Sequence, residues 1–411
     1  MVNGKTFAAV GVAVALLMAG CSSTSTGGSG SAGSGPGVTP KEINLGYLTD
    51  LSGPASAAGK IDYHGSQMFI DQLNKSGGVC GRQIKVQVQD TQYDPQKALS
   101  LYQQTEPNVL GFVSILGTPV LSALAGRVQQ DNVLATTLGW DRANLAKPNY
   151  IVAPSTSDMD LVAGLGWLNE KNMLSNGDAI GEIVMQGLGT AQAPGVEYVT
   201  KMLGLKLSSV NISPSTTDLT SQVQQFKQAG VKVIVVAGLP TQTASAATAA
   251  TAIGLNVPIL TGPAGFTPEL MNSAAGPALA DHLYRVLAWS PFSVNNPEVT
   301  KIQTAFKADP GGVNPADGIV IGWAYAKLYT DIIGKTCDNL TREGMVKALR
   351  STKDLSLTGL TGDLDFSKPG QPPARKFNIL KADASVPGAQ KLVSDPFISP
   401  ELVKNYPASA S

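Results

Sequence analysis

Two histidines, three cysteines and one glycine-rich segment could carry catalysis, metal binding or covalent modification in this sequence. His64 and His282 lie far apart and have no partners at ligand spacing, so a metal centre is not expected. The segment GLGTAQAPG begins like a dinucleotide-binding loop, but Gln192 stands where the third glycine belongs. His64 cannot be paired with a nucleophile or an orienting acid, which indicates a helix-surface or cleft-rim histidine. We therefore expect no enzyme and no cofactor, with a surface hydrolase as a remote alternative.

The N-terminal segment is typical of an export signal. Lys5 supplies a positive charge, and residues 7–19 are apolar over the length of a secretory signal core. The residues Met18-Ala19-Gly20-Cys21 resemble a bacterial lipobox, in which Cys21 would be acylated. An ordinary cleaved signal with a chance cysteine is the alternative. The prediction is a signal peptide over residues 1–20, a flexible Ser/Gly linker over 21–41, and a lipoprotein on the outer side of the cytoplasmic membrane.

Composition and length constrain the body of the protein, C-terminal to the linker. The 30 basic and 30 acidic residues balance and form no basic run, so a nucleic-acid-binding surface is not expected. Roughly 370 residues exceed the size at which one hydrophobic core keeps growing, which favours two lobes. No apolar run of about 18 residues recurs after Cys21, so the body is expected to be soluble.

Alternating apolar runs and amphipathic stretches predict an α/β fold with parallel sheets. A first series has predicted strands at 43–49, 84–90, 109–115 and 133–137. A second series has predicted strands at 181–186, 206–213, 231–238 and 257–262. Predicted helices lie between them and over 297–309, 317–334 and 341–351. Two similar series predict two similar lobes, and parallel sheets bind ligands beyond the carboxyl ends of their strands, so the cleft between the lobes is the expected site.

Cys80 and Cys337 both fall in the first predicted lobe. Because an exported protein meets an oxidising compartment, a disulfide between them is predicted. It would attach the late helices to the early loop and stabilise the fold by about 4 kcal/mol in the chain-entropy model. Two free thiols are the alternative.

Five segments, in order, resemble the periplasmic solute-binding proteins of the branched-chain amino acid type. They are INLGYLTDLSGPASAAG, NKSGGVCGRQIKVQVQDTQYDPQKA, VLGFVSILGTPVLSALAGRVQQDNVLATTL, SQVQQFKQAGVKVIVVAG and AIGLNVPILTGPAGF. The resemblance covers the chain from Ile43 to about Ala382. It implies the type I periplasmic-binding fold: two Rossmann-like lobes, joined by three crossings, that close over a small solute.

The resemblance also implies the ligand-binding residues, residue by residue. Those of the first lobe are Ser52, Gly53, Pro54, Gly117, Thr118, Pro119, Leu138, Gly139 and Trp140. Those of the second lobe are Leu188, Gly189, Thr190, Leu239, Pro240, Pro263 and Ala264, with Gly262 beside them. Glycines would let backbone N–H groups approach a ligand, and an indole would stack on its apolar face. The alternative is that these residues only build turns, or that Trp140 is buried against the other lobe.

The sequence departs from the family at Ala264, where amino-acid binders offer an acid to the ligand ammonium. A buried ammonium without a counter-charge would cost several kcal/mol. We therefore expect a neutral or anionic, partly apolar solute rather than an ordinary α-amino acid. Asp141 or Asp158 could replace the acid.

The resemblance implies a monomeric, lipid-anchored protein that captures a small organic solute and delivers it to the permease of an ABC importer. A sensor of the same fold is the alternative. The expected first lobe spans 42–157 and 290–358, and the second spans 158–289 and 359–411.

Overall fold

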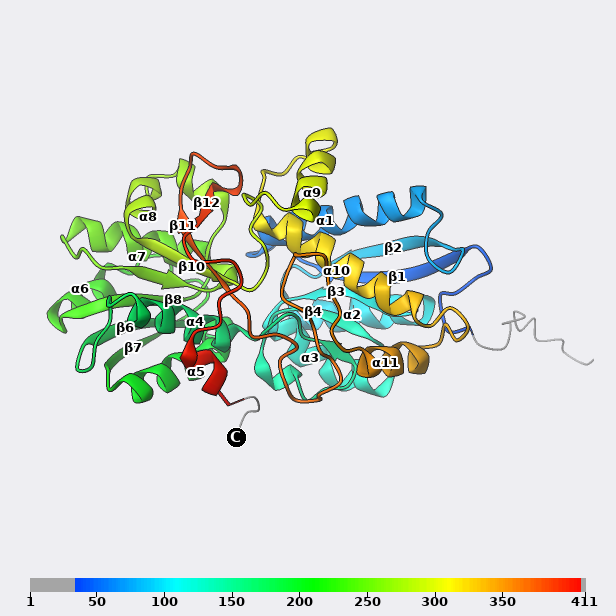
Figure 1. Ribbon diagram of the computed structural model, residues 1–411, viewed down its shortest axis with the longest axis horizontal. Helices are drawn as coiled ribbons and strands as arrows, with labels where there is room; N and C mark the ends of the chain where they lie inside the picture. The colour runs from blue at the N-terminus through cyan, green and yellow to red at the C-terminus, as the bar shows by residue number, and fades with distance from the viewer. Residues whose placement is uncertain (1–33, 408–411) are drawn as a thin grey trace, which may run out of the picture.

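The computed structural model describes residues 34–407, and the predicted signal peptide and Cys21 lie outside them. Two lobes lie side by side, each with a twisted sheet between helices (Figure 1). This is the predicted α/β architecture with parallel-rich sheets, and the prediction is confirmed.

The first lobe is built on a sheet of five strands within the described residues, all neighbouring pairs being parallel. In spatial order the strands are β2 (Gln83–Asp90), β1 (Glu42–Thr49), β3 (Phe112–Leu116), β4 (Ala135–Leu138) and β5 (Tyr150–Ile151). Its helices are α1 (Ser56–Lys75), α2 (Pro95–Thr105), α3 (Thr118–Gln130), α9 (Pro297–Ala308), α10 (Asp317–Gly334) and α11 (Arg342–Ser351). Helix α10 packs along α1 and contributes many of the apolar residues buried in the core of the first lobe.

The second lobe has a sheet of seven strands within residues 34–407. In spatial order they are β12 (Gln390–Leu392), β11 (Asn378–Ala382), β10 (Leu283–Leu287), β9 (Ile259–Thr261), β8 (Val231–Ala237), β6 (Ala179–Met185) and β7 (Lys206–Ile212). Its helices are α4 (Ser157–Glu170), α5 (Leu188–Leu203), α6 (Thr220–Gln228), α7 (Pro240–Ala252), α8 (Gly276–His282) and α12 (Glu401–Asn405). Strand β11 is antiparallel to both of its neighbours, because the chain returns from the first lobe to reach it.

Local sequence signals explain where several elements start. Asp94 caps α2, because its carboxylate accepts hydrogen bonds from the backbone N–H groups of Gln96 at 2.7 Å and Lys97 at 3.2 Å. Pro95 follows at the first helical position, where its missing N–H is not needed. The residue pair Asp94-Pro95 therefore fixes where α2 starts.

The sequence predicts helices over 63–78 and 195–203, whereas α1 and α5 each begin seven residues earlier. The prediction leaves residues 50–60, including Gly59, as a loop and starts the later helix at Gly195. In the structure Gly59 is inside α1, where a Cβ would lie 2.1 Å from the carbonyl oxygen of Asp50. The glycine is thus required by close packing within the helix rather than by a turn.

The structure differs from the expected linker near its C-terminal end. Ser34 forms a β-bridge with Leu340, and the N–H of Gly35 donates to the Leu340 carbonyl at 2.6 Å. Gly37 has φ +73°, and a Cβ there would lie 2.7 Å from the carbonyl oxygen of Asn108. Residues 34–38 are therefore attached to the first lobe rather than part of a free linker.

The last crossing also differs from the expected position at residue 359. Leu360, Leu364, Phe366 and Ala374 are buried in the core that contains α1 and α10. The N–H of Ala374 donates to the Pro154 carbonyl at 2.8 Å, next to the crossing that precedes α4. The chain joins the seven-stranded sheet only at β11, because these apolar side chains fill the first lobe.

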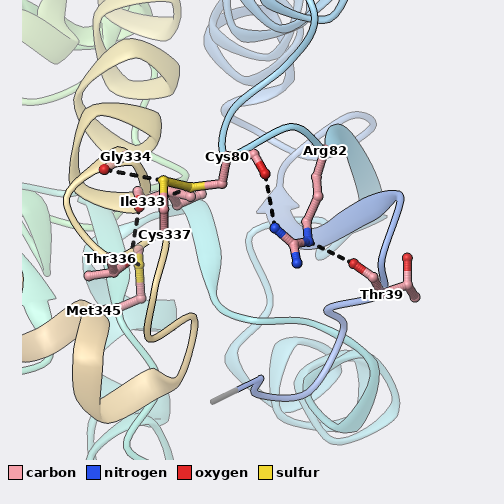
Figure 2. Close-up of a disulfide and its surroundings, with 8 residues drawn as sticks. All are labelled: Thr39, Cys80, Arg82, Ile333, Gly334, Thr336, Cys337 and Met345. Atoms are coloured by element: carbon pink, nitrogen blue, oxygen red, sulfur yellow. Dashed lines mark hydrogen bonds between the residues drawn. A yellow bond between two sulfur atoms is a disulfide. The ribbon is translucent and has the colours of Figure 1, made fainter. Parts of the chain in front are cut away.

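The predicted disulfide between Cys80 and Cys337 is present, with 5.2 Å between the Cα atoms (Figure 2). Cys80 lies in the turn between α1 and β2, and Cys337 follows α10. Arg82 holds the turn, since its guanidinium donates to the carbonyls of Cys80 at 2.9 Å and Thr39 at 2.8 Å. The disulfide ties the early loop to the late helices, as predicted.

Candidate ligand-binding cleft

A cavity of about 150 Å³ is lined by residues of both lobes. Its lining is mostly apolar. The apolar residues are Pro54, Ala55, Ala57, Ala58, Ile61, Leu116, Leu138, Trp140, Ala316 and Ile321 from the first lobe, and Leu188, Leu239, Pro240, Pro263, Ala264, Phe266 and Pro268 from the second. Glycines 117, 139, 318 and 388 complete the wall, together with Asp62, Tyr93, Thr118, Thr267, Arg285 and Asp317. Such a surface favours a solute with an apolar body and few polar groups.

The carboxyl ends of the parallel strands bring most of this lining together. In the first lobe the loops after β1, β3 and β4 reach the cavity, and in the second lobe those after β6, β8 and β9 do so. This is the ligand position expected for open parallel sheets. Gly117 has φ +107°, and a Cβ there would lie 2.8 Å from the Tyr93 ring, so this loop needs glycine.

Eleven of the sixteen predicted ligand-binding residues line this cavity in the described structure. They are Pro54, Gly117, Thr118, Leu138, Gly139, Trp140, Leu188, Leu239, Pro240, Pro263 and Ala264. Trp140 is buried, and its Nε1–H donates to the Tyr325 hydroxyl at 2.6 Å. The indole is thereby held in a fixed orientation beside the cavity.

The other five predicted residues are outside the cavity lining, and most of them have contacts that build the loops. The Ser52 hydroxyl donates to Asp90 at 2.6 Å, and the N–H of Gly53 donates to Asp50 at 2.5 Å. A Cβ on Gly189 would lie 2.4 Å from the Ala237 carbonyl oxygen. Thr190 accepts from the N–H of Gly187 at 3.2 Å, and Pro119 packs near Gly187 of the other lobe.

Neither acid proposed to replace the missing one lines the cavity. Asp141 accepts from the N–H of Ala143 at 2.9 Å and caps a short 3-10 helix. Asp158 is fully buried, lies 3.2 Å from Arg142 Nε, and accepts from the Tyr406 hydroxyl at 2.7 Å. The acids that do line it are Asp62 and Asp317, both from the first lobe, and neither is among the residues predicted from the sequence.

Asp317 forms a buried ion pair across the two lobes with Arg285 of β10, at 2.6 Å. The Arg285 guanidinium also donates to Gln390 Oε1 at 2.6 Å and to the Pro263 carbonyl at 2.5 Å. The N–H of Phe292 donates to the second oxygen of Asp317 at 2.7 Å. Burial raises the pKa of Asp317, and the neighbouring guanidinium opposes that rise. The charges of this pair therefore compensate each other.

Among residues 34–407, Asp62 has no cation paired with it. It lies on α1 and is 2% exposed, and the Tyr47 hydroxyl donates to its Oδ2. Burial raises the pKa of Asp62 to about 7, while the hydrogen bond from Tyr47 lowers it by a smaller amount. One feature of the sequence indicates that Asp62 is buried. It lies three residues after Gly59 and four before Ser66, on the buried face of α1.

The two histidines take no part in this site. His64 lies on α1, where its Nε2 is 2.9 Å from the Asp309 carbonyl oxygen, and it does not line the cavity. Among residues 34–407, no three His, Cys, Asp or Glu side chains are grouped to hold a metal ion. No helix in the same part of the chain is long and apolar enough to cross a membrane.

Residues 42–387 match the family described as periplasmic binding protein. The chain belongs to this family. It is a substrate-binding protein of the type found in ABC transporters for leucine, isoleucine and valine, as the resemblance implied. Periplasmic binding proteins bind solutes outside the cytoplasm, so this chain is an extracytoplasmic solute-binding protein rather than an enzyme.

Three relatives illustrate the range of periplasmic binding proteins that the chain resembles. A fatty acid ABC transporter substrate-binding protein from Thermomonospora curvata has 34% sequence identity and a TM-score of 0.88, over 91% of this chain and 97% of that one. A leucine-, isoleucine-, valine-, threonine- and alanine-binding protein of Pseudomonas aeruginosa is 22% identical over 80% of this chain and 86% of its own. The Leu/Ile/Val-binding protein BraC3 of Rhizobium johnstonii is 30% identical, but the match spans only 20% of this chain and 22% of that protein.

Proposed function

We propose that this protein captures a carboxylic acid with an apolar chain, such as a fatty acid, and delivers it to an ABC importer. The observation that carries the proposal is the cavity lining. Its walls are apolar on both lobes, and Ala264 stands where amino-acid binders offer an acid to the ligand ammonium. An alkyl chain would bury its surface there at about 25 cal/mol per Å².

The relative from Thermomonospora curvata supports the same solute class. That protein is named as the substrate-binding protein of a fatty acid ABC transporter, and it is 34% identical to this chain over nearly all of both proteins. A cavity of about 150 Å³ is comparable to one that holds benzene in another protein. A long alkyl chain would therefore need the lobes to lie further apart than they do here.

An α-amino acid is the second candidate, and Asp62 is the observation that favours it. Its carboxyl group lines the cavity and could in its ionised form accept hydrogen bonds from an ammonium group. The relative from Pseudomonas aeruginosa is named for binding leucine, isoleucine, valine, threonine and alanine. Ala264 has no side-chain oxygen that could accept a hydrogen bond from the ammonium group. An α-amino acid is therefore the second candidate.

Calorimetric titration separates the two candidates. We expect saturable binding of hexanoic, octanoic and dodecanoic acids, with affinity rising with chain length until the cavity is filled. We expect no binding of leucine, isoleucine or valine at the same concentrations. Tight binding of leucine together with no binding of any of the acids would overturn the proposal.

Trp140 offers a first test of the cleft itself. Replacing Trp140 with Phe removes the hydrogen bond to Tyr325 and part of the apolar wall. We expect octanoic acid to bind about tenfold more weakly, since about 1 to 2 kcal/mol of contact is lost. Trp167 is buried in the second lobe away from the cavity, so Trp167→Phe is the matched control. Equal affinities of the two variants would contradict this placement of the solute.

We further propose lipid anchoring through Cys21, which lies outside the described residues, and a monomer that partners a permease. The division into lobes would be 42–157 with 290 to about 374, and 158–289 with about 375–407. After expression in a bacterium with lipoprotein processing, Cys21→Ser is expected to move the protein from the membrane fraction to the soluble fraction. Loss of octanoate uptake on deletion of the gene would favour transport over sensing, and unchanged uptake would favour the sensor.

A further inference from the structure

The Asp62 carboxyl group combines a place in the cavity wall with an unpaired oxygen. Its Oδ2 accepts from Tyr47, while its buried Oδ1 has no hydrogen-bond partner among the residues that the structure describes. A buried acceptor without a donor costs free energy, on the order of 1 to 3 kcal/mol. A solute in the cavity that carries an O–H or N–H group could supply the missing donor.

The hydrogen bonds around Asp62 suit a protonated as well as an ionised carboxyl group. The Tyr47 hydroxyl is 3.2 Å from Ser66 Oγ, and the Ser66 hydroxyl donates to the Gly322 carbonyl at 2.8 Å. If Asp62 carries the proton on Oδ2, it can donate to Tyr47, which then donates to Ser66. If the proton is on Oδ1 instead, Oδ2 still accepts from Tyr47 and Oδ1 becomes a donor, whereas in the ionised state Oδ1 keeps a free lone pair.

In the described structure, no positively charged side chain balances the negative charge of an ionised Asp62. The ionisable groups facing it are Tyr47 of β1 and Tyr325 of α10. Tyr93, Arg285 and Asp317 line other parts of the same cavity, and the charge of Arg285 is already matched by Asp317 at 2.6 Å. Burial therefore raises the pKa of Asp62 to about 7, and near neutral pH the group readily holds a proton.

Building on the proposed function, we infer that Asp62 determines solute specificity by pairing its carboxyl group with the carboxyl group of the solute through one shared proton. The proton lies between Asp62 Oδ1 and one oxygen of the solute. It is supplied by Asp62 when that side chain is protonated and is taken from water when both carboxyl groups are ionised. Two ionised carboxylates would repel each other there, so this cleft takes up solute and proton together.

Calorimetry in buffers of different ionisation heat counts that proton directly. A free fatty acid ionises near the pKa of a glutamate side chain, about 4 to 5, so at pH 8 both groups start ionised. We expect octanoic acid to bind with uptake of close to one proton at pH 8 and close to none at pH 6. Its affinity is expected to fall toward tenfold per pH unit above about pH 7.

The variant Asp62→Asn tests the residue. Its amide N–H can donate to an ionised solute carboxylate without any proton uptake. We expect octanoic acid to bind this variant with the same affinity at pH 6.5 and pH 8.5 and with no proton taken up. The matched control is Glu182→Gln, because Glu182 is equally buried, burial raises its pKa to about 7, and it lies outside the cavity on β6. This control is expected to keep the proton uptake of the unaltered protein.

A second probe keeps the test independent of the variant's folding. Methyl octanoate has the same chain but no ionisable proton, so we expect it to bind the unaltered protein at pH 6 at least tenfold more weakly than octanoic acid. Equal binding of acid and ester, or acid binding without proton uptake at pH 8, overturns the role of Asp62 and leaves the fatty acid proposal standing. Binding of leucine with release of a proton at pH 6 means that ionised Asp62 pairs an ammonium, and overturns both.

Discussion

At the scale of single residues, the cleft depends on how its few polar groups are compensated. Arg285 and Asp317 are both almost fully buried, and they reach each other from different lobes. Placing two charges out of water is unfavourable unless they pair and the remaining donors find acceptors. Gln390, Pro263 and Phe292 supply those partners, so the pair is stable as a set and vulnerable when one member is removed.

Replacing Arg285 with Met is expected to lower the free energy of unfolding by about 3 to 5 kcal/mol, because Asp317 would be left buried and uncompensated. The double variant Arg285→Met with Asp317→Asn is expected to lose less than the single variant. Urea unfolding of the three proteins measures both values. Lys327→Ala is the control, since this partly exposed residue of α10 pairs with Asp331 at 2.9 Å and should cost less than about 0.5 kcal/mol. Additive losses in the double variant would rule out coupling between Arg285 and Asp317.

The cleft residues predicted from the sequence lie in loops at strand ends, where the resemblance to the family is found. Pro54, Thr118 and Trp140 are of this kind, and they line the cavity. Asp62 and Arg285 could not be found this way, because they lie inside regular elements. Asp62 was missed because α1 was expected to begin at Tyr63, so Asp62 was not placed on the buried face of that helix.

At the scale of elements, a buried acid lies next to the edge of the second sheet, outside the cavity between the lobes. Glu182 of β6 lies opposite Ser209 of the edge strand β7, and the Ser209 hydroxyl donates to it at 2.8 Å. Burial raises the pKa of Glu182 to about 7, and a smaller opposing effect comes from the Ser209 hydrogen bond. The strand pair is therefore more stable when this side chain carries a proton.

The sign of the pH dependence follows from that raised pKa. Glu182 favours the folded state fully below its unfolded pKa near 4.5, and this contribution is lost as the pH rises to about 7. Glu182→Gln does not titrate, so relative to the unaltered protein it should gain about 2 to 3 kcal/mol in unfolding free energy between pH 4.5 and pH 8. Urea unfolding at both pH values measures the gain. A constant difference between the two proteins would mean that Glu182 reaches water in the folded state.

The order of the elements could be predicted because helix and strand periods alternate regularly in this chain. Their assignment to lobes was harder after residue 351, where the sequence is rich in turns. Leu360, Leu364 and Phe366 are apolar without helical or strand spacing, so nothing in their pattern tells which core they fill. Only tertiary packing against the first lobe decides it.

At the scale of the whole molecule, the lobes are joined by the crossings, by the ion pair in the cleft and by contacts across its mouth. The Asn314 amide of the first lobe donates to Glu269 of the second at 2.8 Å. The C-terminal segment also bridges them, since Arg142 donates to the Tyr406 hydroxyl at 3.1 Å and to the Pro407 carbonyl. The lobes are thus in contact around the cavity, and a hinge motion would have to break these bonds to admit solute.

The disulfide is expected to matter for stability and little for binding. Replacing both Cys80 and Cys337 with Ser removes a cross-link between residues that are 257 positions apart in the sequence. The unfolded chain then gains conformational entropy. We expect a loss of about 5 to 6 kcal/mol in unfolding free energy by the chain-entropy model, with octanoic acid affinity changed less than twofold. Chemical denaturation and titration of the same sample check both. A large change in affinity would show that the disulfide shapes the cleft.

The same bond makes most of the chain a covalent ring, from residue 80 to residue 337, that contains every strand of the second sheet except β11 and β12. Those two strands come from the tail outside the ring and complete the sheet against β10. A protease that cuts once in an exposed loop such as 213–219 would therefore open the ring without releasing a fragment. Such a nicked molecule would run as one chain on a non-reducing gel and as two on a reducing gel.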